Sequence, residues 1–83
     1  MTIIDVRSPE EYKSERAENS INIPLQEIKN RLSDIQSFAQ PIILCCASGN
    51  RSGMATALLK NEGIDCTNGG SWVNVQQKNN NSI

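Results

Sequence analysis

Histidine is absent from this chain of 83 residues, and aromatic side chains nearly are. Without histidine there is no Ser-His-Asp triad, no imidazole base and no zinc site of the cysteine–histidine kind. The aromatic residues are Tyr12, Phe38 and Trp72 alone, which excludes a large aromatic cage around a ligand. The sequence therefore predicts an aliphatic core and excludes chemistry that depends on histidine or on stacked rings.

A surplus of positive charge is also missing. The 8 Lys and Arg residues face 9 Asp and Glu residues, for a formal net charge of −1. A nucleic-acid-binding domain of this size is expected to carry a basic surplus, so we expect no nucleic-acid partner. The longest apolar run, residues 42–47, is far shorter than the ~20 residues that span a bilayer, and we expect no membrane association. The N-terminus shows no signal-peptide pattern.

Cysteine is present, but not in the pattern of a disulfide-stabilised or metal-bound domain. Cys45 and Cys46 are neighbours, and a disulfide between them would close a strained ring. Together with Cys66 they make an odd count, which favours free thiols in a reducing, cytoplasmic compartment. A zinc site would need all three cysteines plus a carboxylate, without the usual C-x2-C pair, so we expect no metal and no other cofactor.

Strand-like and helix-like segments alternate along the chain. Short β-branched or continuous apolar runs predict strands at residues 3–6, 21–23, 42–45 and 64–67. Apolar spacing and capping residues predict helices at 9–16, 25–35, 52–62 and 71–75, with a turn at 68–70. The first of these helices starts with Ser8 as N-cap, Pro9 at the first helical position and Glu10-Glu11 in the first turn. This alternation predicts an α/β fold with a mostly parallel central sheet flanked by helices. We expect one domain over residues 1–75 and a disordered tail over 76–83.

The loop after the third predicted strand carries the most informative residues. Ligands of open α/β sheets bind beyond the carboxyl ends of the strands, and Cys46 lies at such an end. The N–H groups of the helix that follows favour an anion there, so a thiol in this place loses its proton more easily. Ala47, Ser48 and Gly49 are small enough for the loop amides to turn inward as an anion nest. Arg51 adds a fixed positive charge.

Two interpretations of this loop compete. Cys46 can be a small buried hydrophobic residue and Arg51 a surface charge, as isolated residues of these types often are. The close spacing of cysteine, glycine and arginine between a strand and a helix instead favours a pocket for a thiolate, a persulfide or an oxyanion.

Four segments of the chain form a larger pattern. They are Asp5-Val6-Arg7-Ser8-Pro9-Glu10-Glu11-Tyr12, Ile21-Asn22-Ile23-Pro24-Leu25, Cys46-x-x-Gly49-x-Arg51-Ser52 and Gly69-Gly70. In order and spacing, over about residues 3–72, they resemble the single-domain rhodanese-like sulfurtransferases, and most of all the small phage-shock type. The chain departs from this family at residues 15–20, where a Gly-His-Ile element is common. It also starts almost at the first motif, so the resemblance implies a minimal rhodanese-like fold that lacks the family's N-terminal strand and helix.

The resemblance implies transfer of a sulfane sulfur. By analogy with the family, Cys46 would take a sulfur from a donor such as thiosulfate, form a persulfide, and pass the sulfur to cyanide or a thiol. Arg51 would steady the loop or meet the donor's oxyanion, and no metal or cofactor is needed. The partners implied are a small donor (thiosulfate or a persulfide) and a thiol acceptor, with thioredoxin or a cysteine desulfurase as protein partners. The substrate-binding residues implied are Ala47, Ser48, Gly49, Asn50 and Ser52.

Two other functions stay open from the sequence. A rhodanese-like fold can serve as a non-catalytic sulfur carrier or regulatory binding module. A phosphatase would use the Cys-x5-Arg spacing from Cys45 to Arg51. Cys46 is favoured as the nucleophile because Gly49 follows it by three residues, whereas Cys45 continues the apolar strand. We expect structural roles for Cys45, Cys66 and the Asp5–Arg7 motif.

Overall fold

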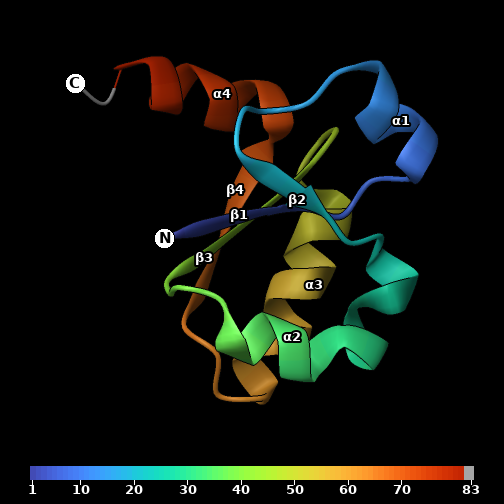
Figure 1. Cartoon of the computed structure of the whole chain (residues 1–83), viewed down its shortest axis with the longest axis vertical. Coiled ribbons are helices and arrows are strands. Elements are labelled where there is room, and N and C mark those ends of the chain that lie inside the picture. Colours follow the sequence, from blue (N-terminus) through green and yellow to red (C-terminus); the bar gives the residue numbers. More distant parts are fainter. Residues whose placement is uncertain (82–83) are drawn as a thin grey trace.

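Four parallel strands form the centre of the structure (Figure 1). The structure is a computed structural model, and it describes residues 1–81. The strands lie in the order β2-β1-β3-β4, and each pairing is parallel. Their bounds are Thr2–Asp5 for β1, Ser20–Asn22 for β2, Ile42–Cys46 for β3 and Cys66–Ser71 for β4. The predicted α/β fold with a parallel sheet is confirmed.

Helices cover the two faces of this sheet unequally. The 3-10 helix η1 (Leu25–Arg31), α2 (Leu32–Ser37) and α3 (Asn50–Asn61) pack on one face, and α4 (Trp72–Asn81) lies on the other (Figure 1). The short helix α1 (Pro9–Ser14) joins β1 to β2. No helix among residues 1–81 is long and apolar enough to cross a membrane.

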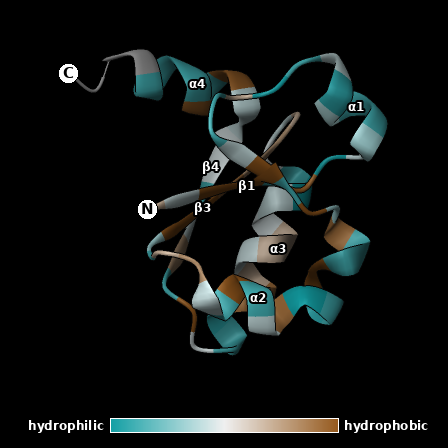
Figure 2. Ribbon diagram, in the orientation of Figure 1, coloured by the Kyte–Doolittle hydropathy of each residue, from teal (hydrophilic) through white to brown (hydrophobic). Residues whose placement is uncertain are grey.

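The core is divided by the sheet into a large and a small cluster. In Figure 2 the apolar colour is strong on β1 and β3, the two central strands. The large cluster lies under α3 and includes Leu44, Cys46 and Leu59. The small cluster lies under α4 and includes Cys45 and Val75. Because side chains alternate along a strand, the two neighbouring cysteines enter different clusters.

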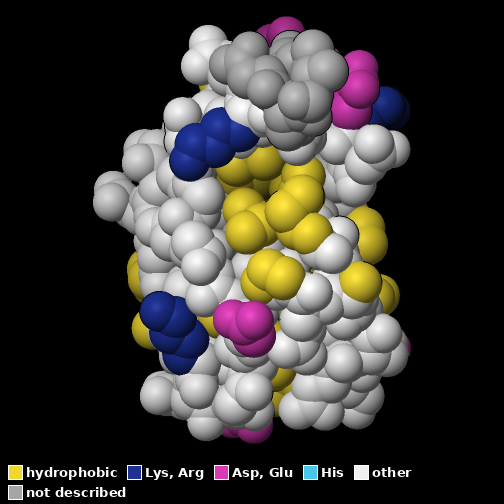
Figure 3. All heavy atoms as spheres, turned by 90° about the vertical axis from the view of Figure 1, so that its left-hand side faces the viewer, with side chains coloured by type: hydrophobic (Ala, Val, Ile, Leu, Met, Phe, Trp, Pro, Cys, Tyr) yellow, Lys and Arg dark blue, Asp and Glu magenta, His cyan; other side chains and the backbone are white. Residues whose placement is uncertain are grey.

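The face under α4 is only partly covered. A hollow of about 260 Å³ opens beside α4, lined by apolar side chains that include Met1, Ile3, Ile43 and Val75 (Figure 3). The much larger cluster under α3 therefore supplies most of the packing that holds β3, and with it the segment after β3, in place.

Three segments differ from the sequence-based expectation. The single helix expected over 25–35 is divided into η1 and α2, and the three-residue spacing of Leu25 and Ile28 suits the 3-10 period. The turn expected at 68–70 belongs to β4, where the register slips so that Leu44 pairs with Asn68 and Cys45 with Gly70. Residues 76–81, expected as a disordered tail, continue helix α4, while 82–83 lie outside the described residues.

Candidate active site

Cys46 is the last residue of β3, and the loop after it folds back over the sulfur. Its Sγ accepts a hydrogen bond from the backbone N–H of Gly49 at 3.0 Å and from that of Ser52 at 3.4 Å. The hydroxyl of Ser52 lies 3.4 Å from the same sulfur. Both Cys46 and Ser52 are 0% exposed. The loop thus forms an amide cradle around one buried sulfur atom, which we define by residues 46–52.

Gly49 makes this cradle possible. It has a φ of 99°, in the left-handed region that favours glycine, and it caps the N-terminus of α3. The reversal turns the loop amides toward Cys46 and places the carbonyl of Gly49 against the N–H of Gly53 at 2.9 Å. A Cβ at Gly49 would also lie 3.5 Å from Cα of Gly70 on β4. The spacing of this glycine from Cys46 is therefore a requirement of the loop geometry.

The cradle favours the thiolate form of Cys46. Burial by itself would raise the pKa of Cys46. The hydroxyl of Ser52 and the N–H groups of Ser52, Gly49 and Ser48 outweigh this effect and lower the pKa from 9.0 to about 7. The direction is the one expected from the sequence, and the hydrogen bonds that cause it come from the loop and from Ser52 in the first turn of α3. Cys46 is therefore far more readily deprotonated near neutral pH than an ordinary cysteine.

Cys45 has the opposite environment. It packs in the small cluster under α4 and is 0% exposed. Burial, together with the nearby charge of Asp5, raises its pKa to about 12. The third thiol, Cys66, is buried in the large cluster, and burial raises its pKa as well. The geometry therefore supports Cys46 as the nucleophile.

Asn68 on β4 braces the cradle, and the sequence did not indicate it. Its Oδ1 accepts hydrogen bonds from the Ser52 hydroxyl at 2.6 Å and from the N–H of Gly70 at 3.0 Å. Its Nδ2 donates to the carbonyl of Gly49 at 3.0 Å. Asn68 therefore holds the Ser52 hydroxyl in place beside the sulfur of Cys46. The only available signal was the position of Asn68 directly before the Gly69-Gly70 pair.

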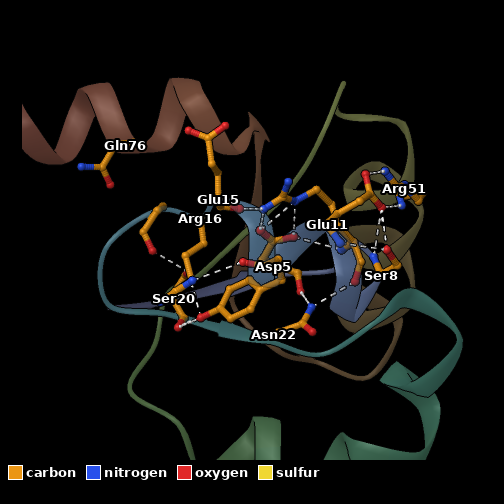
Figure 4. Close-up of polar contacts among 12 residues, drawn as sticks. Asp5, Ser8, Glu11, Glu15, Arg16, Ser20, Asn22, Arg51 and Gln76 are labelled. Carbon is orange, nitrogen blue, oxygen red and sulfur yellow. Dashed lines mark hydrogen bonds and ion pairs between the residues drawn. The ribbon is translucent and has the colours of Figure 1, made fainter.

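Arg51 does not point freely into the site. Its Nη1 and Nη2 donate to Oε1 and Oε2 of Glu11 at 2.7 and 3.0 Å, a forked ion pair between α3 and α1 (Figure 4). Glu11 also forms a capping box with Ser8, since its Oε1 accepts from the N–H of Ser8 at 3.1 Å. First Arg51 and then Ser8 lower the pKa of Glu11 to about 2. The sequence indicated this cap but not its partner 40 residues away.

A second ion pair joins Asp5, the last residue of β1, to Arg7. The carboxylate of Asp5 accepts from the backbone N–H of Arg7 at 2.9 Å and from its guanidinium at 2.8–3.0 Å. Arg7 further donates to the carbonyl of Glu15 at 2.6 Å and stacks on Trp72 at 5.2 Å. Both residues are buried, and their contacts are the structural ones expected from the sequence.

The remaining candidate residues lie at the rim of the cradle. Ala47 and Ser48 are exposed, and Asn50 is the exposed first residue of α3. Among residues 1–81, no group of three or more cysteines and carboxylates lies close enough to hold a metal ion. The structure thus brings Cys46, Gly49 and Ser52 together, whereas the side chain of Arg51 is paired with Glu11.

Comparison with known proteins identifies the family of this chain. The model of the rhodanese-like domain family matches residues 1–77. The thiosulfate sulfurtransferase PspE of Escherichia coli is 38% identical over 61 residues, which are 72% of this chain and 59% of the relative. YrkF of Bacillus subtilis, whose name proposes a sulfur carrier, is 35% identical over 77% of this chain and 34% of its own length.

A solved structure shows the same fold. A rhodanese from E. coli, determined with anions, superposes with a TM-score of 0.80 at 33% identity, covering 88% of each chain. The chain spans only 59% and 34% of the length of the two curated relatives.

Proposed function

This chain belongs to the rhodanese-like domain family, and from that membership we propose a sulfurtransferase that carries a sulfane sulfur on Cys46. The donor is thiosulfate or a persulfide, and the acceptor is a thiol, with cyanide as its substitute in an assay. Thioredoxin and a cysteine desulfurase are the protein partners we propose for these two roles. Sulfur transfer in general is supported by the family and by relatives named sulfurtransferases.

The proposed reaction has two displacement steps. The Cys46 thiolate attacks the outer sulfur of thiosulfate, the S–S bond of the donor breaks, and sulfite leaves with the electron pair. An acceptor thiolate or cyanide then attacks the outer sulfur of the Cys46 persulfide, and Cys46 leaves as a thiolate. The two steps balance without an external oxidant or reductant, and a thiolate stabilised by its surroundings needs no histidine base.

The observation that carries this proposal is the set of donors around one sulfur. Backbone N–H groups of Gly49 and Ser52 point at Sγ of Cys46, and the pKa of this thiol is lowered to about 7 despite full burial. A structural cysteine in an apolar core, such as Cys45, shows the reverse. In the persulfide, we propose that the rim amides of Ala47, Ser48, Asn50 and Arg51 hold the negative charge of the outer sulfur.

A sulfur carrier is the second candidate. The observation that favours it is the relative YrkF, which is named for carriage rather than turnover. A phosphatase based on Cys45 has little support, because that thiol packs under α4 with a pKa raised to about 12.

The test is thiosulfate:cyanide turnover in the parent, Cys46→Ser and Cys45→Ser proteins, with intact mass after thiosulfate treatment. We expect turnover and an adduct of one sulfur atom in the parent and in Cys45→Ser, and neither in Cys46→Ser. An adduct without turnover would support the carrier instead. Neither turnover nor adduct in the parent would reject both candidates.

A further inference from the structure

The positive charge nearest the cradle is already neutralised. Both Nη atoms of Arg51 donate hydrogen bonds to the two carboxylate oxygens of Glu11, in the forked geometry that gives arginine its strongest pairing. Glu11 is ionised at neutral pH like any ordinary glutamate, and the hydrogen bonds from Arg51 lower its pKa further, to about 2. Arg7, which follows the neighbouring strand β1, is likewise paired with Asp5. The attraction for an anion near Cys46 therefore comes mainly from backbone N–H groups.

Glu11 is held in place independently of Arg51. The N–H and the hydroxyl of Ser8 both lie 3.1 Å from its Oε1, and the same hydroxyl accepts from the N–H of Glu11 at 3.2 Å. This capping box fixes the carboxylate at the start of α1 (Figure 4). A donor anion that binds Arg51 must therefore displace the carboxylate of Glu11 from the guanidinium. Because Ser8 holds this carboxylate in place, its negative charge then stays beside the donor without its ion-pair partner.

From this geometry we propose that Glu11 sets the donor specificity of the site. By occupying Arg51, it disfavours doubly charged donors such as thiosulfate relative to singly charged donors such as organic thiosulfonates and persulfides. The inference rests on the proposed sulfur transfer and adds a residue that acts on the choice of donor through Arg51. Discrimination by an unpaired charge is a common means of excluding one of two similar ligands.

The experiment compares Glu11→Gln with Glu10→Gln. A glutamine at 11 keeps an oxygen for Ser8 but removes the charge that neutralises Arg51. Glu10 is an exposed neighbour in the same first turn, so its substitution removes an equal charge without touching Arg51. The donors are thiosulfate and benzenethiosulfonate, which both offer a sulfane sulfur and carry two and one negative charges. Cyanide is the acceptor, and kcat/KM is measured for each donor.

We expect Glu11→Gln to raise the thiosulfate-to-benzenethiosulfonate ratio of kcat/KM about fivefold, the upper end of what a half-exposed ion pair contributes. Glu10→Gln should leave the ratio within twofold of the parent. In an Arg51→Gln background the Glu11→Gln change should lose its effect, because Glu11 acts through Arg51. Arg51→Lys keeps the charge without the fork, and should raise the ratio in the same direction if Glu11→Gln does not fold.

The outcomes separate the two proposals. Turnover of both donors with a ratio that Glu11→Gln leaves unchanged, or that Glu10→Gln raises equally, would overturn the role of Glu11 and leave sulfur transfer intact. A Glu11 effect that persists in the Arg51→Gln background would also overturn it. A parent that turns over neither donor would reject the proposed function itself.

Discussion

Cys45 and Cys46 are joined by one peptide bond, yet they lie in two regions with opposite chemistry. Cys46 faces the cradle and the α3 side of the sheet, and Cys45 faces the packed layer under α4. Both are 0% exposed, and burial acts to raise the pKa of each thiol, but hydrogen-bond donors outweigh burial only at Cys46. The pKa of Cys46 is lowered to about 7 and that of Cys45 is raised to about 12.

The difference comes from hydrogen-bond donors. The sulfur of Cys46 receives backbone N–H groups because the loop reverses at Gly49, whereas Cys45 is surrounded by apolar neighbours with the charge of Asp5 nearby. A buried thiol is therefore reactive only where the backbone supplies donors to its charged form. The two faces of β3 show both cases, a thiol with donors and a thiol without them, in a single strand.

The largest expected effect is on thiol reactivity. Two double variants each keep one thiol. Cys45→Ser with Cys66→Ser keeps Cys46, and Cys46→Ser with Cys66→Ser keeps Cys45. At pH 8 the thiolate fraction of Cys46 should exceed that of Cys45 by roughly four orders of magnitude. We expect iodoacetamide to modify the folded Cys46 protein long before the Cys45 protein, as followed by intact mass. In urea the two should react alike, and equal rates in the folded state would contradict the comparison.

A smaller effect is expected from Gly69→Ala, which changes the side under α4. A Cβ at this position would lie 2.8 Å from Cγ2 of both Ile43 and Val75 and 3.2 Å from the carbonyl of Leu44. Overpacking of this kind costs about 1–3 kcal/mol of unfolding free energy, which a denaturant titration would measure. The alkylation midpoint of Cys46 should stay where it is, and a shift of that midpoint would show that the two regions are coupled.

The smallest expected effect is that of Asn68→Asp on the pKa of Cys46. A carboxylate holds the Ser52 proton more tightly, adds negative charge near the sulfur and loses the bond to Gly49, and each change disfavours the thiolate. We expect the midpoint of Cys46 alkylation to rise by roughly one pH unit. Asn74→Asp is the control, since Asn74 donates to the carbonyl of Gly69 instead. A lowered midpoint in Asn68→Asp would reject the influence of Asn68 on the pKa of Cys46 through the Ser52 hydroxyl.

The pattern of strands and helices was predictable because it depends on local signals. The start of α1 is indicated by Ser8, Pro9 and Glu11, and the structure shows the full capping box. Residues 76–81 were not predicted as helix, because this stretch has little apolar pattern of its own. Val75 of α4 packs into the small cluster, and the side chain of Gln76 accepts a hydrogen bond from the N–H of Glu18. Contacts with residues far away in the sequence, 58 positions in the case of Gln76, thus hold the first turns of α4 in place.

The sequence by itself determined the parallel α/β order, the position of Cys46 at a strand end and the glycine that lets the loop reverse. These depend on spacing along one short segment, which the chain cannot rearrange. Only the tertiary structure decided that Arg51 pairs with Glu11 and that Asn68 accepts a hydrogen bond from the Ser52 hydroxyl. Both are long-range contacts of polar side chains, and their partners depend on how α1, α3 and β4 meet around the end of the sheet.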